Sequence, residues 1–156
     1  MAYFKDLSVY TYGGNDRPRP LENNVGWLDS GHLFPTAMPS EILLDQIWKV
    51  CKIRVRQMRG VHMCNLCPRS DSHTASLESH FFARNKEKLL LGSAEIRTFS
   101  RRGAIFAAPN LIYHYISAHH YRPPEEFVES LTEGLCPPDP QYFAELEKLG
   151  HNWHQL

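Results

Sequence analysis

Two cysteines with only two residues between them, Cys64 and Cys67, carry the clearest chemical signal in the chain. Thiolates at this spacing can lie on one tight turn and share a tetrahedral metal ion. Redox proteins use the same spacing, but there the pair usually opens a helix in a βαβ unit. Here residues 59–63 predict a strand before the pair, and Pro68 follows it in a polar stretch. The context therefore favours a zinc knuckle.

A zinc knuckle needs two further ligands, and the chain offers nine histidines. His114 and His119 have four residues between them, which is within the spacing that zinc fingers use. His120 competes with His119 for the last place. A helix predicted over 110–120 turns by about 100° per residue, which puts His119 inside its apolar stripe and His120 outside it. We therefore predict His114 and His119 as the remaining ligands.

Four such ligands make a closed site. Two sulfurs and two nitrogens complete a tetrahedron and leave no position for water, which is typical of structural rather than catalytic zinc. Binding of the ion can add on the order of 10 kcal/mol to folding. His73 or His80, in the polar loop after the cysteines, is an alternative for one of the two histidines.

The elements around the histidine helix follow the ββα order of a zinc finger. Strands are predicted over 89–99 and 103–108, joined by a turn that contains Gly103, and the helix follows directly. The stretch between the cysteine pair and the histidine pair is far longer than in a short finger. We therefore predict a finger-like site that is expanded by an inserted hairpin.

Apolar periodicity predicts four helices, over residues 40–52, 110–120, 124–132 and 140–149. Ser40 and Asp139 are suitable N-caps for the first and the last helix. Pro109 is expected to open the histidine helix, because proline is favoured in a first helical turn. Gly150 is expected to end the last helix.

The remaining segments complete the expected fold. The aromatic-rich residues 3–12 predict a first strand, and residues 25–35 predict an irregular segment with Trp27 as its anchor. Cys51 lies in the apolar stripe of the first helix, which predicts a buried thiol. The chain is expected to be α+β, with one small antiparallel sheet and four helices, in a single zinc-binding domain over residues 1–156.

Charge and composition limit the classes of partner. Lys+Arg and Asp+Glu number 17 each, so the net charge is zero, whereas a nucleic-acid-binding protein usually has a basic excess. Arg97, Arg101 and Arg102, with Phe99 between them, could still contact phosphates, although a solvated hairpin tip is the simpler interpretation. No apolar run is long enough for a bilayer and no signal peptide is evident, so we expect a cytoplasmic protein without a membrane partner.

Three strings of the sequence resemble a family of small, uncharacterised bacterial proteins. They are residues 24–32 (NVGWLDSGH), the Cys-x-x-Cys pair, and the stretch from 108 to 127 with its histidine-containing helix before a Tyr-x-Pro-Pro-x-x-Phe turn. The resemblance covers roughly residues 3–130 and leaves the C-terminal helix outside. It implies no activity that can be carried over to this chain.

Catalytic signals are weak by comparison. The sequence has no His-Glu-x-x-His, P-loop, nucleophile-elbow or dinucleotide-binding motif. Asp29 and His32 could form an acid–base pair, but a packed loop with Trp27 as its anchor is the favoured explanation. Glu125 or Glu126 could act as a general base beside an open zinc, but both also suit the start of a helix.

These observations favour a zinc-stapled, non-catalytic protein that binds another protein, as an immunity protein, antitoxin or adaptor does. A zinc-dependent hydrolase with an open metal site is one alternative, and a nucleic-acid-associated zinc finger is another. The sequence names neither the partner nor the oligomeric state.

Overall fold

The structure is a computed structural model that describes residues 2–11, 20–68 and 80–155. Its helices are α1 (Glu41–Cys51), α2 (Ile112–His119), α3 (Glu125–Thr132) and α4 (Pro140–Lys148). Its strands are β1 (Glu22–Asn24), β2 (Ile53–Val55), β3 (Phe81–Arg84), β4 (Glu87–Leu90), β5 (Glu95–Phe99), β6 (Ile105–Pro109) and β7 (Trp153–Gln155). The α+β class and the four helices are as predicted.

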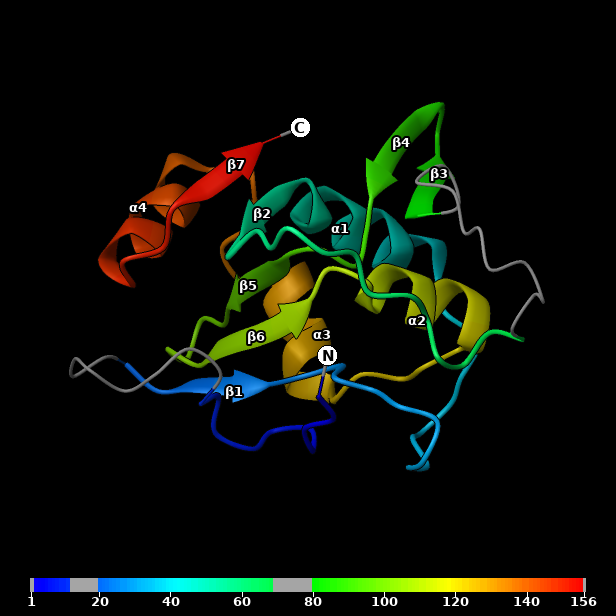
Figure 1. Cartoon of the computed structure of the whole chain (residues 1–156). Coiled ribbons are helices and arrows are strands. Elements are labelled where there is room, and N and C mark those ends of the chain that lie inside the picture. The colour runs from blue at the N-terminus through cyan, green and yellow to red at the C-terminus, as the bar shows by residue number, and fades with distance from the viewer. Residues whose placement is uncertain (1, 12–19, 69–79, 156) are drawn as a thin grey trace.

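A five-stranded sheet in the order β1-β6-β5-β2-β7 forms the centre of the fold (Figure 1). The β5–β6 pair is antiparallel, with Glu95 opposite Pro109 and Phe99 opposite Ile105. β1 runs parallel to β6, so the prediction of a purely antiparallel sheet is wrong. The reason is that β1 reaches this edge from a distant part of the chain and not through a hairpin turn.

The strand predicted over 89–99 is divided between two sheets. Gly92 has φ +101° and separates β4 from β5. β4 pairs with β3 in a separate two-stranded sheet, whereas β5 enters the main sheet. A continuous strand is impossible here because the backbone turns away at Gly92.

Local capping signals place the helices. The Ser40 side chain accepts the Leu43 N–H at 3.1 Å, and the Asp139 side chain accepts the Gln141 N–H at 2.9 Å. Pro109, in contrast, does not open α2 but is the last residue of β6. Asn110 then turns the chain, because its backbone N–H binds the Ala94 carbonyl at 2.9 Å and holds it against β5.

Two strands predicted from composition are absent from the described residues. Of residues 3–11, only Val9 makes a strand-like bridge, to Asn23. Residues 59–63 belong to no strand, and the first two of them lie in a bend. Conversely, β2 was not predicted, because its three residues follow α1 directly and resemble a continuation of that helix.

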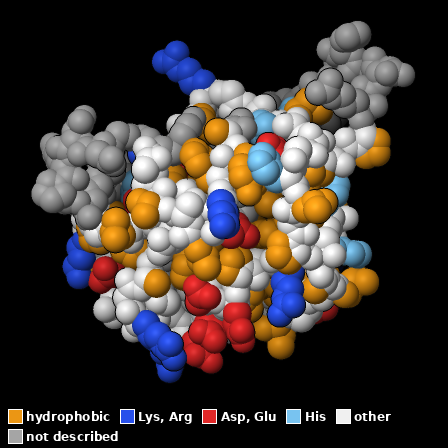
Figure 2. Space-filling view, turned by 90° about the horizontal axis from the view of Figure 1, so that it is seen from below, with side chains coloured by type: hydrophobic (Ala, Val, Ile, Leu, Met, Phe, Trp, Pro, Cys, Tyr) orange, Lys and Arg blue, Asp and Glu red, His pale blue; other side chains and the backbone are white. Residues whose placement is uncertain are grey.

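The described residues bury two apolar clusters. The larger one lies between α1, α2, α3 and the strands β4 to β6, and it includes Cys51, which is 1% exposed as predicted for a core thiol. The smaller one lies under α4 and includes Tyr142 and Leu146. Seen from below, the surface mixes apolar, basic and acidic side chains, in keeping with the zero net charge (Figure 2). In the described part of the chain, no helix combines the length and the apolar character needed to cross a membrane.

Candidate metal centre

The structure brings Cys64, Cys67, His114 and His119 together. One ligand atom from each lies within 4.8 Å of all the others. The Cys67 sulfur is 3.1 Å from His114 Nε2 and 3.3 Å from His119 Nε2, and the Cys64 sulfur is 3.3 Å from His119 Nε2. In a tetrahedral zinc site, bond lengths near 2.3 and 2.0 Å separate sulfur from nitrogen by about 3.5 Å. The four side chains are therefore close enough to bind a metal ion.

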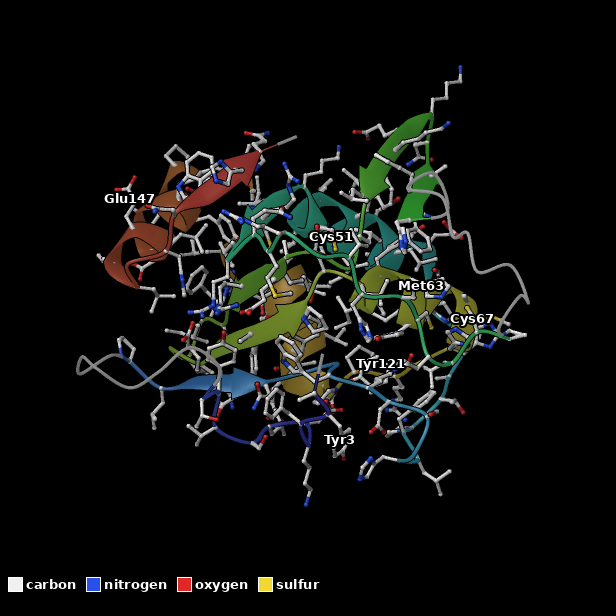
Figure 3. The ribbon with its side chains drawn as sticks, in the orientation of Figure 1. Tyr3, Cys51, Met63, Cys67, Tyr121 and Glu147 are labelled. Atoms are coloured by element: carbon white, nitrogen blue, oxygen red, sulfur yellow. The ribbon has the colours of Figure 1, made fainter. Side chains whose placement is uncertain are left out.

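The cysteine pair lies on a turn that is tied to the rest of the fold. The His62 N–H donates to the Gly92 carbonyl at 2.8 Å, and the Met58 N–H donates to the Ser93 carbonyl at 2.7 Å. Cys64 and Leu66 pack against the larger apolar cluster. These contacts fix the direction from which the two sulfurs approach α2, on the side of the molecule where Cys67 is labelled in Figure 3.

The histidines are held by the buried face of α2. Ile112, Tyr115 and Ile116 are 2% exposed or less and fix the rotation of the helix. The helix ends at His120, which takes the left-handed conformation with φ 55° and donates its N–H to the Tyr115 carbonyl. His119 is therefore the last helical residue and turns towards the sulfurs, whereas His120 is exposed. The choice of His119 over His120 agrees with this geometry.

The electrostatic surroundings suit neutral imidazoles beside a cation. Burial, with the charge of His119 adding to it, lowers the pKa of His114 to about 4, so its nitrogen is free to ligate. Burial raises the pKa of Cys64 to about 11, although N–H groups of Leu66 and Cys67 oppose that rise. Burial also raises the pKa of Tyr115, and charge on the two sulfurs raises it further. A bound cation would favour both thiolates.

Other candidate ligands lie elsewhere. No Asp or Glu oxygen of the described residues belongs to the four-atom group. His80 precedes β3, where its carbonyl accepts the Leu91 N–H at 3.1 Å, and it is not part of the group. His73 lies outside the described residues.

Comparison with known families gives one match. A family model described as a domain of unknown function, DUF7919, matches residues 2–132. The chain belongs to this family. All four candidate ligands lie within the DUF7919 match, and α4 and β7 lie beyond it. Comparisons with curated proteins and with solved structures gave no match.

The Asp29–His32 pair predicted from the sequence is present within the DUF7919 region. His32 Nδ1 lies 2.7 Å from Asp29 Oδ1, and the His32 ring stacks on Tyr3 at 3.7 Å between centroids. Trp27 is buried, as expected of an anchor, and donates its indole N–H to the Ala107 carbonyl at 3.0 Å. The imidazole of His32 is half exposed on a loop, and a packed loop accounts for both its contact with Asp29 and its stacking on Tyr3.

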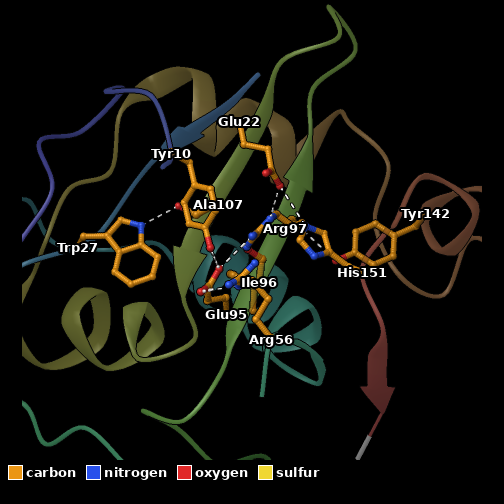
Figure 4. A network of polar contacts seen from close by, with 10 residues as sticks. All are labelled: Tyr10, Glu22, Trp27, Arg56, Glu95, Ile96, Arg97, Ala107, Tyr142 and His151. Atoms are coloured by element: carbon orange, nitrogen blue, oxygen red, sulfur yellow. Dashed lines mark hydrogen bonds and ion pairs between the residues drawn. The ribbon is translucent and has the colours of Figure 1, made fainter. Parts of the chain in front are cut away.

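For Arg97, the structure contradicts both the solvated hairpin tip that the sequence favours and the alternative of phosphate contact. This side chain is fully buried, with Nε 2.6 Å from Glu22 Oε1 and Nη2 2.9 Å from Glu95 Oε1 (Figure 4). Arg101 donates to the Glu133 carbonyl at 2.7 Å. Side chains alternate between the two faces of a strand, so Arg97 shares one face of β5 with Glu95, and both faces of this strand are buried. Tyr10 covers the guanidinium at 4.8 Å from the ring centroid, and two carboxylates balance its charge.

Sequence reasoning missed the buried network around Arg97. His151 Nε2 lies 3.2 Å from Glu22 Oε1, and the Tyr10 hydroxyl donates to Glu95 at 2.7 Å. Burial alone would raise the pKa of Glu22, but hydrogen bonds from His151 and Arg97 outweigh it and lower the pKa to about 2. Glu95 is only two residues before Arg97 on β5, but no local signal marks Tyr10, Glu22 and His151, which come from opposite ends of the described chain.

Proposed function

We propose that this DUF7919 protein is a zinc-stapled, non-catalytic protein that binds another protein in the cytoplasm. The observation that carries the proposal is the convergence of two sulfurs and two imidazole nitrogens within 4.8 Å. The proposal has three parts, which are the metal, its structural role and the kind of partner.

Zinc fits this donor set better than other common ions. Two thiolates and two imidazoles at tetrahedral spacing are a frequent structural zinc set. Calcium and magnesium prefer oxygen ligands, and iron–sulfur clusters usually need four cysteines. Cys51 is buried in the core, and Cys136 donates to the Leu131 carbonyl at 3.2 Å, so neither of these joins the pair.

A structural role follows from the count of protein ligands. Four donors complete the tetrahedron, and the ion then ties the cysteine turn to α2. A hydrolase would need an open position and a nearby general base. Glu126 does not fill that role, because it lies in the first turn of α3 and lines a hollow with Arg101 and Arg102. A closed centre of this kind supports a binding role, as in an immunity protein, antitoxin or adaptor.

Metal analysis of the purified chain tests the zinc part. We expect one zinc ion per chain, and a cobalt-substituted sample should give the absorption spectrum of a tetrahedral site with thiolate ligands. Absence of zinc from protein that was never exposed to chelator would contradict the metal assignment, and a spectrum of a five-coordinate site would support the hydrolase instead.

Co-expression tests the binding part. The chain is produced together with the product of the adjacent gene, and the mixture is separated by size-exclusion chromatography. We expect a stoichiometric complex that is lost when zinc is removed. Catalytic turnover of a test ester or peptide by the zinc-loaded protein, abolished by Cys64→Ser, would count against a non-catalytic role.

A further inference from the structure

We propose that the cysteine pair, Cys64 and Cys67, is a redox site that a hydroperoxide converts to a reversible disulfide, with release of the zinc ion. This inference rests on the proposed function, because it names a regulation of the same metal centre. The substrate class is a small peroxide such as hydrogen peroxide. Oxidation of the pair then controls the complex with the partner protein through the loss of the metal.

The two sulfurs of the cysteine pair are near enough to bond to each other. Asn65 and Leu66 form the turn between the two cysteines, and both sulfurs belong to the group of ligand atoms that lie within 4.8 Å of one another. The end residues of a tight turn have Cα atoms less than about 7 Å apart, and a disulfide usually joins Cα atoms about 4.4–6.8 Å apart. A disulfide therefore requires a change within the turn and none in the helices.

The cysteine pair is also open to a small oxidant. Both cysteines are half-buried, whereas Met63 and Asn65, on either side of Cys64, are exposed. Figure 3 labels Met63 and Cys67 away from the centre of the molecule. A metal ion holds its cysteine ligands as thiolates, and the thiolate is the form that attacks a peroxide. Zinc therefore prepares the same two atoms for oxidation.

The other two thiols of the chain are set apart from the cysteine pair. Cys51 is 1% exposed, and its thiol donates to the Asn110 carbonyl at 3.5 Å. The Cys136 thiol, beyond the end of α3, donates to the Leu131 carbonyl at 3.2 Å. Burial raises the pKa of both thiols, which keeps them protonated and poorly reactive. A small dose of peroxide is therefore expected to oxidise the pair first.

The reaction removes two electrons from the cysteine pair. One thiolate attacks a peroxide oxygen, the O–O bond breaks, and the cysteine becomes a sulfenic acid while hydroxide leaves. The second thiolate then attacks the oxidised sulfur, the S–O bond breaks, and the disulfide forms as a second hydroxide leaves. In sum, two thiolates, one hydrogen peroxide and two protons give one disulfide and two water molecules.

Formation of the disulfide leaves the metal ion with too few donors. Thiolates bind zinc and a disulfide does not replace them, so only the imidazoles of His114 and His119 remain from the group. The fully buried side chains of Ile112 and Ile116 still hold α2 in the core. The oxidised chain therefore loses zinc at a point where the fold has other contacts. In the proposed cytoplasmic setting thiols are kept reduced, so a disulfide there is transient, as a regulatory one must be.

The test treats the zinc-loaded full chain with a small molar excess of hydrogen peroxide. A chromogenic chelator measures the free zinc, and mass spectrometry of peptides locates the disulfide. We expect one zinc ion to be released for each disulfide formed, and the disulfide to join Cys64 to Cys67. A phosphine reductant and added zinc should restore the centre. The complex with the co-expressed partner should dissociate over the same range of peroxide.

Two variants separate disulfide formation from general oxidation. Cys67→His keeps four donors, and after oxidation of the remaining sulfur three imidazoles can still hold the ion. It should keep most of its zinc at a dose of peroxide that empties the wild type. Cys136→Ser is the matched control and should release zinc as the wild type does. The position of the disulfide in the wild type is an independent measurement, which does not depend on how well Cys67→His loads with metal.

Several outcomes overturn the inference. Zinc that stays bound while Cys64 and Cys67 remain thiols does so, as does zinc release without a disulfide between them. Equal release from the wild type and a zinc-loaded Cys67→His protein also contradicts it. If a chelator dissociates the partner complex and peroxide does not, the redox site is wrong while the proposed function stands. If peroxide forms the disulfide and releases zinc from a chain that binds no partner, the redox site stands and the proposed binding function is wrong.

Discussion

At the scale of single residues, each cysteine sulfur is one of the four candidate ligands of the metal ion, so the loss of one sulfur leaves three. The Cys64 sulfur lies 3.3 Å from His119 Nε2, and it connects the cysteine turn to the end of α2. We expect Cys64→Ser to lose the ion and to lower the free energy of unfolding by several kcal/mol, because the energy of metal binding contributes to folding. Metal analysis and thermal unfolding measure both effects.

Cys136→Ser is the matched control for this substitution. The Cys136 thiol donates to the Leu131 carbonyl at 3.2 Å, and a serine hydroxyl can do the same. This variant should keep its zinc and nearly all its stability. A Cys64→Ser protein that stays metal-loaded and as stable as Cys136→Ser would show that the four side chains do not share an ion.

The number of protons released on zinc binding distinguishes a thiol ligand from an imidazole ligand. Without metal the pKa of Cys64 is about 11 and that of His114 is about 4, so at neutral pH the first holds a proton and the second does not. Zinc affinity should therefore rise with pH, since Cys64 gives up a proton on binding, while His114 contributes to that dependence only in acid. We expect His114→Cys to release about one more proton per ion and to show a steeper rise of affinity with pH. Chelator competition across pH measures this, and an unchanged slope would contradict it.

A substitution of Glu22 tests how much the buried network around Arg97 contributes to stability. It is 5% exposed and lies 2.6 Å from Arg97, which is fully buried. Glu22→Gln leaves that charge partly uncompensated, so we expect a loss of about 3 kcal/mol in urea unfolding. Glu87→Gln removes the partner of Lys52 at the surface and should cost less than about 1 kcal/mol. Equal losses in the two variants would mean that burial of the network matters little.

At the scale of elements, Gly92 connects the sheet with the cysteine turn. A Cβ built on it would lie 2.3 Å from the His62 carbonyl oxygen. Gly103 also has positive φ, but a Cβ there meets nothing within 4 Å. We expect Gly103→Ala to cost about 1–2 kcal/mol through backbone strain alone.

Gly92→Ala should cost more than Gly103→Ala, because the clash adds to the strain. It should also weaken zinc binding, since the displaced carbonyl lies two residues before Cys64. The free energy of unfolding and the zinc affinity are compared for the two variants. If Gly92→Ala keeps normal zinc affinity, then the cysteine turn does not depend on this contact.

Elements with local signals were predictable, and elements made by long-range pairing were not. Ser40 and Asp139 cap their helices as expected, and His119, which the helical phase favours over His120, is the one that lies beside the two sulfurs. The parallel pairing of β1 has no local signal, because Glu22 pairs with Ile105 of β6, which lies 83 positions later in the chain (105 − 22). The strand predicted over 59–63 failed for a related reason, since β propensity cannot show whether a neighbouring strand is present to pair with it.

On the scale of the whole molecule, the DUF7919 match ends before α4 and β7, yet both complete the fold. β7 pairs with β2, and the Tyr142 hydroxyl donates to the Arg97 carbonyl at 2.8 Å. We expect a chain that ends at residue 132 to be unstable although it keeps all four candidate ligands, because the smaller apolar cluster and the Arg97 network lose their cover. Circular dichroism and metal analysis test this, and a well-folded, zinc-loaded truncated chain would contradict it.

The order of residues along the chain has a consequence for biosynthesis. Cys64, Cys67, His114 and His119 all precede His151, which closes over Glu22. The full set of metal donors therefore leaves the ribosome before the segment that seals the Arg97 network does. Ion capture can come first, and the late segment then closes on a part that is already in place.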